Sequence, residues 1–236
     1  MKKTVSIIIP VYNEEKYITK TIAEVLKANT IGFKKEIIIV DDGSTDKTAL
    51  KIKALRLKVK KIFKKTNQGK GAAIKSGLKL AKGEIILIQD ADLEYNPKDY
   101  PYLLKPFQNK KTDVIYGSRT LGMRKFHNSY SGLIFYIGGQ IVTIAVNLVY
   151  GTNLTDQPTG YKVFRRKYIK DLLNKSLDNG FSYEVGMTAL FVKKGATIKE
   201  VPISYKPRHI DQGKKINFFD FLESLYATIK YKFLFS

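Results

Sequence analysis

Residues 1–118 alternate between short, continuous apolar runs and longer segments in which apolar residues recur every three or four positions. Continuous runs are typical of strands buried on both faces of a sheet, and the longer spacing is typical of helices that cover it. The alternation predicts an α/β fold with a mostly parallel sheet, which binds ligands beyond the carboxyl ends of its strands. Ser44 or Thr45 is expected to cap the second helix, and Gly83 to close the third. The expected strands are residues 5–11, 37–40, 59–63, 84–89 and 113–116, and the expected helices are residues 14–26, 44–57, 71–81 and 97–107.

The second half begins with an apolar segment, residues 131–150, that contains no charged residue. Its length is near the roughly 20 residues that cross a bilayer. Gln140, Thr143 and Asn147 fall on one helical face, however, and such a narrow polar stripe favours an interfacial or packed helix over a spanning one. A core helix of a soluble protein is the alternative. Beyond it we expect a loop at residues 153–159, strands at 161–164 and 197–205, helices at 166–173 and 183–193, and a final helix at 217–235 whose aromatic residues and lysines suit a membrane interface.

The amino-acid composition limits the kinds of metal site and of binding partner that the chain can have. The chain has 236 residues, which suits a single domain spanning 1–236, and it contains no cysteine and two histidines. Cysteine-ligated zinc and iron–sulfur sites are therefore excluded, and any metal is expected to be a hard cation bound by carboxylates. The formal net charge is +21, from 42 basic and 21 acidic residues. Nucleic acid, an anionic membrane and phosphorylated substrates would each match that charge, and so would a general bias toward lysine.

An acidic motif follows the expected strand at residues 84–89. Asp90 and Asp92 are separated by one residue, and Glu94 adds a third carboxylate. Carboxylates at the end of a buried strand, together with substrate phosphate oxygens, make a suitable site for Mg²⁺ or Mn²⁺. We therefore predict these three residues as metal ligands, with a solvated acidic turn as the alternative.

Two other strand ends carry candidates for binding a nucleotide. Asp41 and Asp42 follow the second strand, where acidic side chains can accept hydrogen bonds from a base or ribose. A capped tight turn is the alternative for this pair. Pro10, Tyr12 and Glu14 lie at the end of the first strand. Tyr12 is placed to stack on a base, and Glu14 to contact the base or to cap a helix.

A glycine-rich turn opens the helix expected at residues 71–81. It does not complete a dinucleotide-binding fingerprint, because Ile74 stands where a third glycine is needed, and it also fails the Walker pattern. A turn whose backbone N–H groups face a phosphate fits it. Gly69 and Lys70 are therefore expected to contact a phosphate group of a bound nucleotide.

These motifs, in this order, resemble the family 2 glycosyltransferases, which have the GT-A fold. Beyond residue 118 the chain is similar to the polyprenyl-phosphate hexose synthases, the dolichyl-phosphate mannose synthase group, and the resemblance covers about residues 4–216. Mannose synthases often have glutamine at the position of Glu94. The segments that carry the resemblance are residues 10–14, 41–44, 67–71, 90–97, 117–119, 156–161, 181–184, 201–205, Arg208 and 213–216.

The resemblance implies an inverting, metal-dependent transfer of mannose or glucose from a nucleotide-diphosphate sugar, GDP-mannose or UDP-glucose, to a polyprenyl phosphate. Asp92, Arg119 and Arg208 would be the catalytic residues. Arg119, Arg165 and Arg208 would clamp the acceptor phosphate, for which a bidentate guanidinium is well suited. Asp156 would lie near the acceptor and either orient an arginine or contact the sugar.

A lipid acceptor would also account for the second half. The helix at 131–150 would lie near the polyprenyl chain, and basic residues from 119 to 125 would face anionic headgroups. We therefore expect peripheral attachment at the cytoplasmic membrane face, with a nucleotide-sugar half (1–118), an acceptor half (119–216) and an interfacial helix (217–236). A soluble or polysaccharide acceptor is the alternative. A non-catalytic polyanion-binding protein is a remote one, and no nucleic-acid partner is expected because the basic residues are dispersed.

Overall fold

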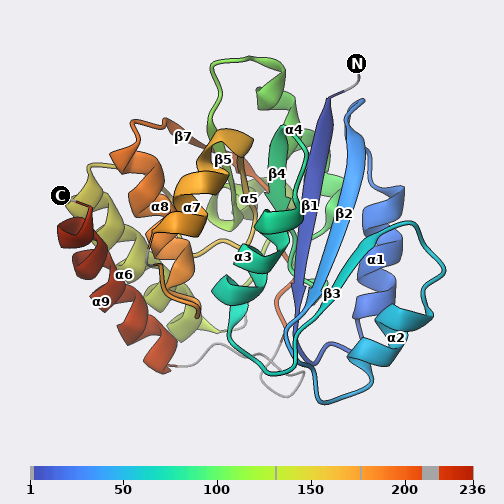
Figure 1. Ribbon diagram of the computed structural model, residues 1–236. Coiled ribbons are helices and arrows are strands. Elements are labelled where there is room, and N and C mark those ends of the chain that lie inside the picture. The colour runs from blue at the N-terminus through green and yellow to red at the C-terminus, as the bar shows by residue number, and fades with distance from the viewer. Residues whose placement is uncertain (1–2, 131, 176, 209–217, 236) are drawn as a thin grey trace.

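The computed structural model describes residues 3–130, 132–175, 177–208 and 218–235. Its centre is a seven-stranded sheet in the order β3-β2-β1-β4-β6-β5-β7, with helices on both faces (Figure 1). Strand β6 is antiparallel to both of its neighbours, and the other pairings are parallel. The expected α/β fold with a mostly parallel sheet is confirmed. The strands are β1 (Thr4–Val11), β2 (Lys34–Asp41), β3 (Lys60–Phe63), β4 (Ile85–Ile88), β5 (Val114–Ser118), β6 (Lys162–Arg165) and β7 (Ile198–Pro202).

Two apolar cores lie on opposite faces of the sheet. Successive side chains of a strand point to opposite faces, so Ile7 and Ile9 enter one core while Ile8 enters the other. The first core is covered by α1, α2 and α4, and the second by α3, α7 and α8. The helices of these layers are α1 (Ile18–Lys27), α2 (Thr48–Ala54), α3 (Lys70–Leu80), α4 (Tyr100–Leu104, flanked by single turns at Pro97–Asp99 and Lys105–Gln108), α7 (Ile169–Asn174, preceded by a turn at Arg166–Tyr168) and α8 (Tyr183–Lys193).

Some local expectations were wrong. Helix α2 begins only at Thr48, and Ser44 does not cap it, because its hydroxyl donates to Asp41 and accepts from the backbone of Asn13. Helix α3 ends at Leu80, and Gly83 packs against β1, where its N–H donates to Ser6. A short helix α5 (Arg119–Phe126) follows β5, although its periodicity is too weak for the sequence to predict it.

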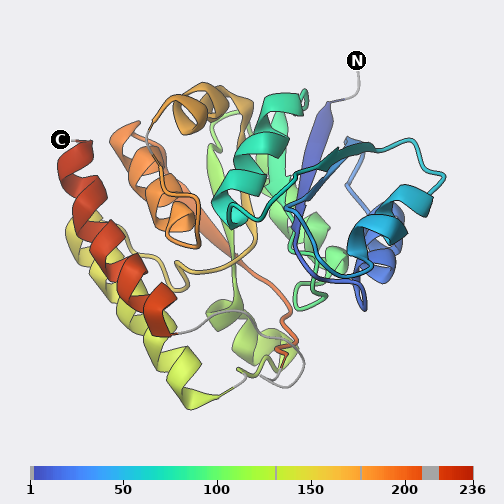
Figure 2. The same cartoon turned by 60° about the horizontal axis from the view of Figure 1, so that its bottom comes forward.

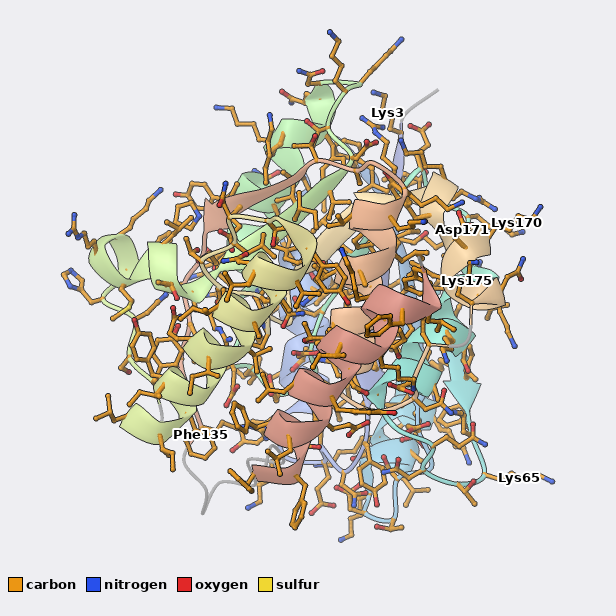
Figure 3. The ribbon with its side chains drawn as sticks, turned by 90° about the vertical axis from the view of Figure 1, so that its left-hand side faces the viewer. Lys3, Lys65, Phe135, Lys170, Asp171 and Lys175 are labelled. Atoms are coloured by element: carbon orange, nitrogen blue, oxygen red, sulfur yellow. The ribbon has the colours of Figure 1, made fainter. Side chains whose placement is uncertain are left out.

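Helices α6 (Leu133–Tyr150) and α9 (Phe218–Leu234) lie side by side at the end of the molecule away from β1–β3 (Figure 2). Figure 3 faces this pair, with Phe135 labelled near the beginning of α6. Within the described ranges, α6 is the one helix long and apolar enough to cross a membrane by length and composition. The described residues do not include Ser131, residues 213–216 or Asn217, so the expectations for these positions stay predictions.

Helix α6 contributes Val142 and Val146 to the second core but turns most of its apolar side chains outward. Ile134 is 77% exposed and Leu148 is 80% exposed. Phe219 and Phe233 of α9 extend this surface with exposed fractions of 78% and 76%. We call the surface the apolar face; its members are Leu133, Ile134, Ile137, Ile141, Ile144, Leu148, Phe218, Phe219, Leu222, Tyr226, Ile229, Phe233 and Leu234.

Candidate active site

Strands β1, β2, β4 and β5 run in one direction and end at the same edge of the sheet. Parallel register pairs Val11 with Asp41 and Ile8 with Ile88, so the loops that follow these strands meet. Strand β6 runs the other way, and the segment that precedes it therefore reaches the same edge. This edge collects the polar side chains described below.

Two aspartates follow β4, and each is paired with a cation. Asp90 Oδ1 lies 2.8 Å from Lys70 Nζ, and Asp92 Oδ2 lies 3.2 Å from Arg208 Nη2. Burial raises the pKa of Asp92 to about 7; the neighbouring carboxylates add to this shift, whereas Arg208 opposes it. A divalent cation at Asp90 and Asp92 would relieve the same repulsion. The two carboxylates therefore suit Mg²⁺ or Mn²⁺, which prefer oxygen ligands.

Glu94, the third predicted ligand, makes contacts of a different kind in this structure. Its Oε2 accepts a hydrogen bond from Tyr205 Oη at 2.8 Å, and its Oε1 accepts one from the backbone of Arg208 at 2.7 Å. Among the residues that the structure describes, no group of three or more His, Cys, Asp or Glu side chains is gathered to hold a metal. Glu94 instead fixes the chain segment that carries Arg208.

Arg208 links the ends of the first and fourth strands. Its Nη1 and Nη2 donate to the Glu14 carboxylate at 3.0 and 3.3 Å, and its guanidinium lies over the ring of Tyr17. Its buried Nε has no hydrogen-bond partner among the described residues and lies 3.8 Å from Glu94 Oε1. Glu14 therefore contacts an arginine in this arrangement and does not cap α1, whose N-terminal cap lacks a side-chain hydrogen bond.

Arg119 begins α5 and is held in a fixed orientation. Its Nε and Nη2 donate to the two oxygens of Asp156 at 2.8 and 2.7 Å, which is the bidentate geometry. Its guanidinium lies 5.1 Å from the ring centre of Tyr205 and 5.6 Å from that of Tyr130. Of the two roles considered for Asp156, the structure shows the one in which it orients an arginine.

Helix α6 supports this arrangement through its polar stripe. Gln140 Nε2 donates to the Thr155 carbonyl at 3.3 Å, Thr143 Oγ1 accepts from the Gln157 backbone at 3.1 Å, and Asn147 bonds the backbone of Leu154. The stripe therefore faces the protein and holds the segment on which Asp156 is carried. Through this segment, the inner face of α6 helps to hold Arg119 in place.

The candidates after β2 hold a turn together. Asp42 Oδ1 lies 2.6 Å from Lys64 Nζ, and its Oδ2 accepts from the backbone of Gln68 and Gly69 at 3.1 and 2.7 Å. Asp41 accepts from Ser44. Gly69 has a φ of +98°, which favours glycine, and an added Cβ would lie 2.5 Å from the Asn179 carbonyl oxygen. The two aspartates thus shape the turn that leads into α3.

The three candidates at the end of β1 lie in different surroundings. Pro10 is a buried residue of the strand, paired in register with Val40, and Tyr12 follows the strand and is half-buried. The Glu14 carboxylate is connected to Asp92, because Arg208 pairs with both.

Arg165 lies at the opposite edge of the sheet, so its prediction as a phosphate ligand is corrected. It pairs in register with Ile85, the first residue of β4, because β6 is antiparallel. Its side chain donates to the carbonyl oxygens of Thr112 and Asn109 at 2.7 and 2.9 Å. The arginine therefore binds backbone far from the two aspartates.

Sequence reasoning missed two buried residues of the site, Glu184 and Lys162. Glu184 of α8 lies 2.8 Å from Lys70 Nζ and 3.5 Å from Lys162 Nζ. Burial opposes ionisation of Glu184, but both lysines outweigh it and lower its pKa. Burial likewise opposes the charge on Lys70, and the Asp90 and Glu184 carboxylates outweigh it and raise the pKa of the amine. The signal for Glu184 was its place in the segment 181–184, which carried the family resemblance without a role.

The chain is similar to several known proteins. The family model described as "Glycosyl transferase family 2" matches residues 6–173. An uncharacterized protein of Methanocaldococcus jannaschii is 29% identical over 96% of this chain and 98% of its own. A dolichyl-phosphate beta-glucosyltransferase of Trichomonas vaginalis is 29% identical over 85% of this chain and 65% of its own. A dolichol-phosphate mannosyltransferase of Pyrococcus furiosus is 28% identical over 97% of this chain and 64% of its own.

Solved structures confirm the fold. Glucosyl-3-phosphoglycerate synthase from Mycobacterium tuberculosis, in complex with UDP, superposes with a TM-score of 0.73 over 98% of this chain and 80% of that chain, at 18% identity. The same enzyme has been crystallised with Mn²⁺, UDP and phosphoglyceric acid. Its likeness to this chain concerns the GT-A architecture alone. Because the family model covers most of the chain, the acidic edge of this sheet belongs to a family 2 glycosyltransferase with the GT-A fold.

Proposed function

We propose that this glycosyltransferase moves a hexose, with inversion, from a nucleotide-diphosphate sugar to a polyprenyl phosphate at a membrane surface. The observation that supports a lipid acceptor is the orientation of α6, which turns most of its apolar side chains outward and its polar stripe toward the protein. Its polar stripe holds the segment of Asp156, which orients Arg119, while its outer side belongs to the apolar face. The two similar dolichyl-phosphate enzymes support the same acceptor class.

On the donor side, Asp90 and Asp92 would hold Mg²⁺ or Mn²⁺. When bound, the cation supplies charge neutralisation to the departing diphosphate. Lys70, held charged at the start of α3, is placed to bind the same diphosphate, beside the turn that Asp42 shapes. The donor is GDP-mannose or UDP-glucose, and a nucleotide-diphosphate sugar of either base would present its diphosphate to Lys70 and the two aspartates.

On the acceptor side, Arg119 and Arg208 are placed to bind the phosphate. Both guanidinium groups are buried and paired with carboxylates, and the Nε of Arg208 is without a hydrogen-bond partner among the residues that the structure describes. A phosphate monoester is anionic at neutral pH, so it can attack the anomeric carbon without a strong general base. Catalysis therefore depends on orientation and charge compensation, and a single displacement inverts the anomeric centre.

The apolar face would lie on the cytoplasmic side of the membrane as a peripheral contact. Exposed aliphatic and aromatic side chains of this kind bury favourably at the boundary between headgroups and acyl chains. Lys232 in the last turn of α9 adds positive charge near the face, and anionic lipids attract such a residue with about 1 kcal/mol. The rest of the positive charge is spread over both halves, and composition bias explains that part.

The test is an extraction assay. The protein is incubated with Mn²⁺, a polyprenyl phosphate in anionic vesicles and radiolabelled UDP-glucose or GDP-mannose. Label that moves into the organic phase supports the proposal, and Asp92→Asn should remove it. Label that appears only on a water-soluble phosphorylated acceptor would replace the lipid proposal with the soluble alternative. Absence of transfer to either acceptor with any donor would overturn both.

A further inference from the structure

A buried carboxylate on α8 reaches the site from behind. Glu184 lies in the first turn of the helix and is 7% exposed. Its Oε1 lies 2.8 Å from Lys70 Nζ, and the same amine lies 2.8 Å from Asp90 Oδ1. The amine of Lys70 is therefore shared between Asp90 at the sheet edge and Glu184 on α8, which follows Lys70 by more than a hundred residues.

Around Glu184, the number of positively charged side chains equals the number of negatively charged ones. Lys162 is fully buried and donates to the carbonyl oxygens of Gln157 and Thr159, and its Nζ lies 3.5 Å from Glu184 Oε2. Two lysines thus face two carboxylates, Asp90 and Glu184. Loss of the Glu184 charge would leave Lys70 with Asp90 as its remaining anionic partner, and a buried ion pair that has lost its alternative partner is held more tightly.

The position of Glu184 is set by contacts on both sides of its segment. Ser182 Oγ donates to Glu223 of α9 at 2.8 Å, and the backbone of Asp178 donates to Tyr231 of the same helix at 2.7 Å. On the other side, the Asn179 carbonyl accepts from the backbone of Ala72 in α3 at 3.2 Å. The carboxylate is therefore carried by a segment fixed between two helices.

We propose that Glu184 is a positioning residue that retains Lys70 at the donor site and so allows Asp90 to exchange that lysine for a divalent cation. The inference rests on the proposed function, because it takes Asp90 as a metal ligand. In the absence of the cation, Lys70 occupies both carboxylates. When the cation binds Asp90, the lysine stays on Glu184, charged and close to the diphosphate.

The test measures Mn²⁺ affinity in the presence of UDP, by electron paramagnetic resonance of free Mn²⁺. Glu184→Gln should weaken binding by about 10- to 100-fold, the range found when a partner behind a metal ligand is removed. In the same titration without UDP, where Lys70 has no diphosphate to bind, Lys70→Met in the Glu184→Gln background should restore most of the affinity that Glu184→Gln loses, because the competing amine is gone. A merely structural role for Glu184 would give no such restoration.

The matched control is Glu223→Gln, which loosens the same segment without touching Lys70. It should bind Mn²⁺ within about threefold of the unaltered protein, and thermal unfolding of each variant checks its folding. The inference is overturned if Glu184→Gln binds normally, if the double variant does not recover, or if Glu223→Gln is equally weak. If the unaltered protein binds no Mn²⁺ with UDP, the proposed metal site fails and this inference fails with it.

Discussion

Helices α1 and α6 have opposite arrangements of polar and apolar residues. In α1, Ile18 and Ile22 are buried against the sheet while Lys20 is exposed, as in any helix at the surface of a water-soluble protein. In α6, Val146 is buried beside the polar Thr143, whereas Ile134 and Leu148 are exposed. Helix α6 therefore presents most of its apolar residues to the outside, and α1 buries most of its own.

The difference is informative because the inward polar residues of α6 are satisfied. Asn147 donates to the carbonyl of Leu154 and accepts from its N–H, so this half-buried polar side chain has the hydrogen bonds that a specific packing contact requires. Exposed apolar area of this extent is rare on monomeric soluble proteins unless something covers it. We infer that the half with α1 meets water and the half with α6 meets lipid, and the following experiments test that division.

The largest effect is expected at the metal ligands in the water-facing half. Asp92→Asn removes a charge that would hold the cation, and such a cation is worth several kcal/mol to the leaving group, or about 1,000-fold in rate. Transfer should fall by that factor for a long polyprenyl phosphate in vesicles and for a short, water-soluble analogue alike. Steady-state rates with both acceptors measure it, and retention of normal activity would reject the metal role of Asp92.

The next effect concerns the link between the halves. Arg119→Lys loses the bidentate contact with Asp156 and the position between two tyrosine rings, so the acceptor phosphate is misplaced. A misplacement of about 1 Å costs about 100-fold in rate. Arg165→Lys is the matched control, because that arginine lies at the opposite edge of the sheet, and its kcat should be unchanged. Equal effects of the two substitutions would contradict the assignment.

Substitutions on the apolar face should separate the two halves. Ile134→Glu and Leu148→Glu each remove a side chain that lipid would bury, at about 1.5 kcal/mol or more, which is about tenfold in vesicle binding. Flotation with anionic vesicles measures this loss. Activity on the short, water-soluble acceptor should be retained. Leu50→Glu is the control, because this leucine is 64% exposed on α2, in the half assigned to water; vesicle binding reduced equally by all three would refute the division.

The smallest effect is a dependence of stability on pH in the donor half. Burial opposes ionisation of Glu36, but hydrogen bonds from Lys60, Ser6 and the Lys82 backbone outweigh it and lower its pKa. A lowered pKa stabilises the fold above the pKa of the unfolded chain, and this stabilisation is lost as the pH falls through the folded value. Glu36→Gln should remove about 1 kcal/mol or less of the change in unfolding free energy between pH 7 and pH 3. Denaturant titrations at the two pH values measure it, and an undiminished change would contradict the link.

Much of the fold was predictable because its strands are continuous apolar runs. Residues 37–40 and 85–88 can be buried on both faces only in a covered parallel sheet, and that places Asp90 at the ligand edge. The direction of β6 was not predictable, since a four-residue strand carries no signal for its orientation. Arg165 was proposed because it lies near a position of the resembling family, and the antiparallel strand instead places it at the opposite edge of the sheet. Nor does local sequence reveal that Arg208 pairs with Glu14, because only the folded chain brings together residues so far apart.

Strand β6 also has a consequence for the order of folding. It lies between β4 and β5, although the chain makes β5 and all of α6 before it. As the polypeptide leaves the ribosome, β4 and β5 therefore have no partner on their facing sides until residue 165 has emerged. Unpaired strand edges attract other chains. A nascent chain of this protein therefore passes through an interval in which its most apolar helix and the open edges of β4 and β5 are exposed together, and aggregation is favoured most in that interval.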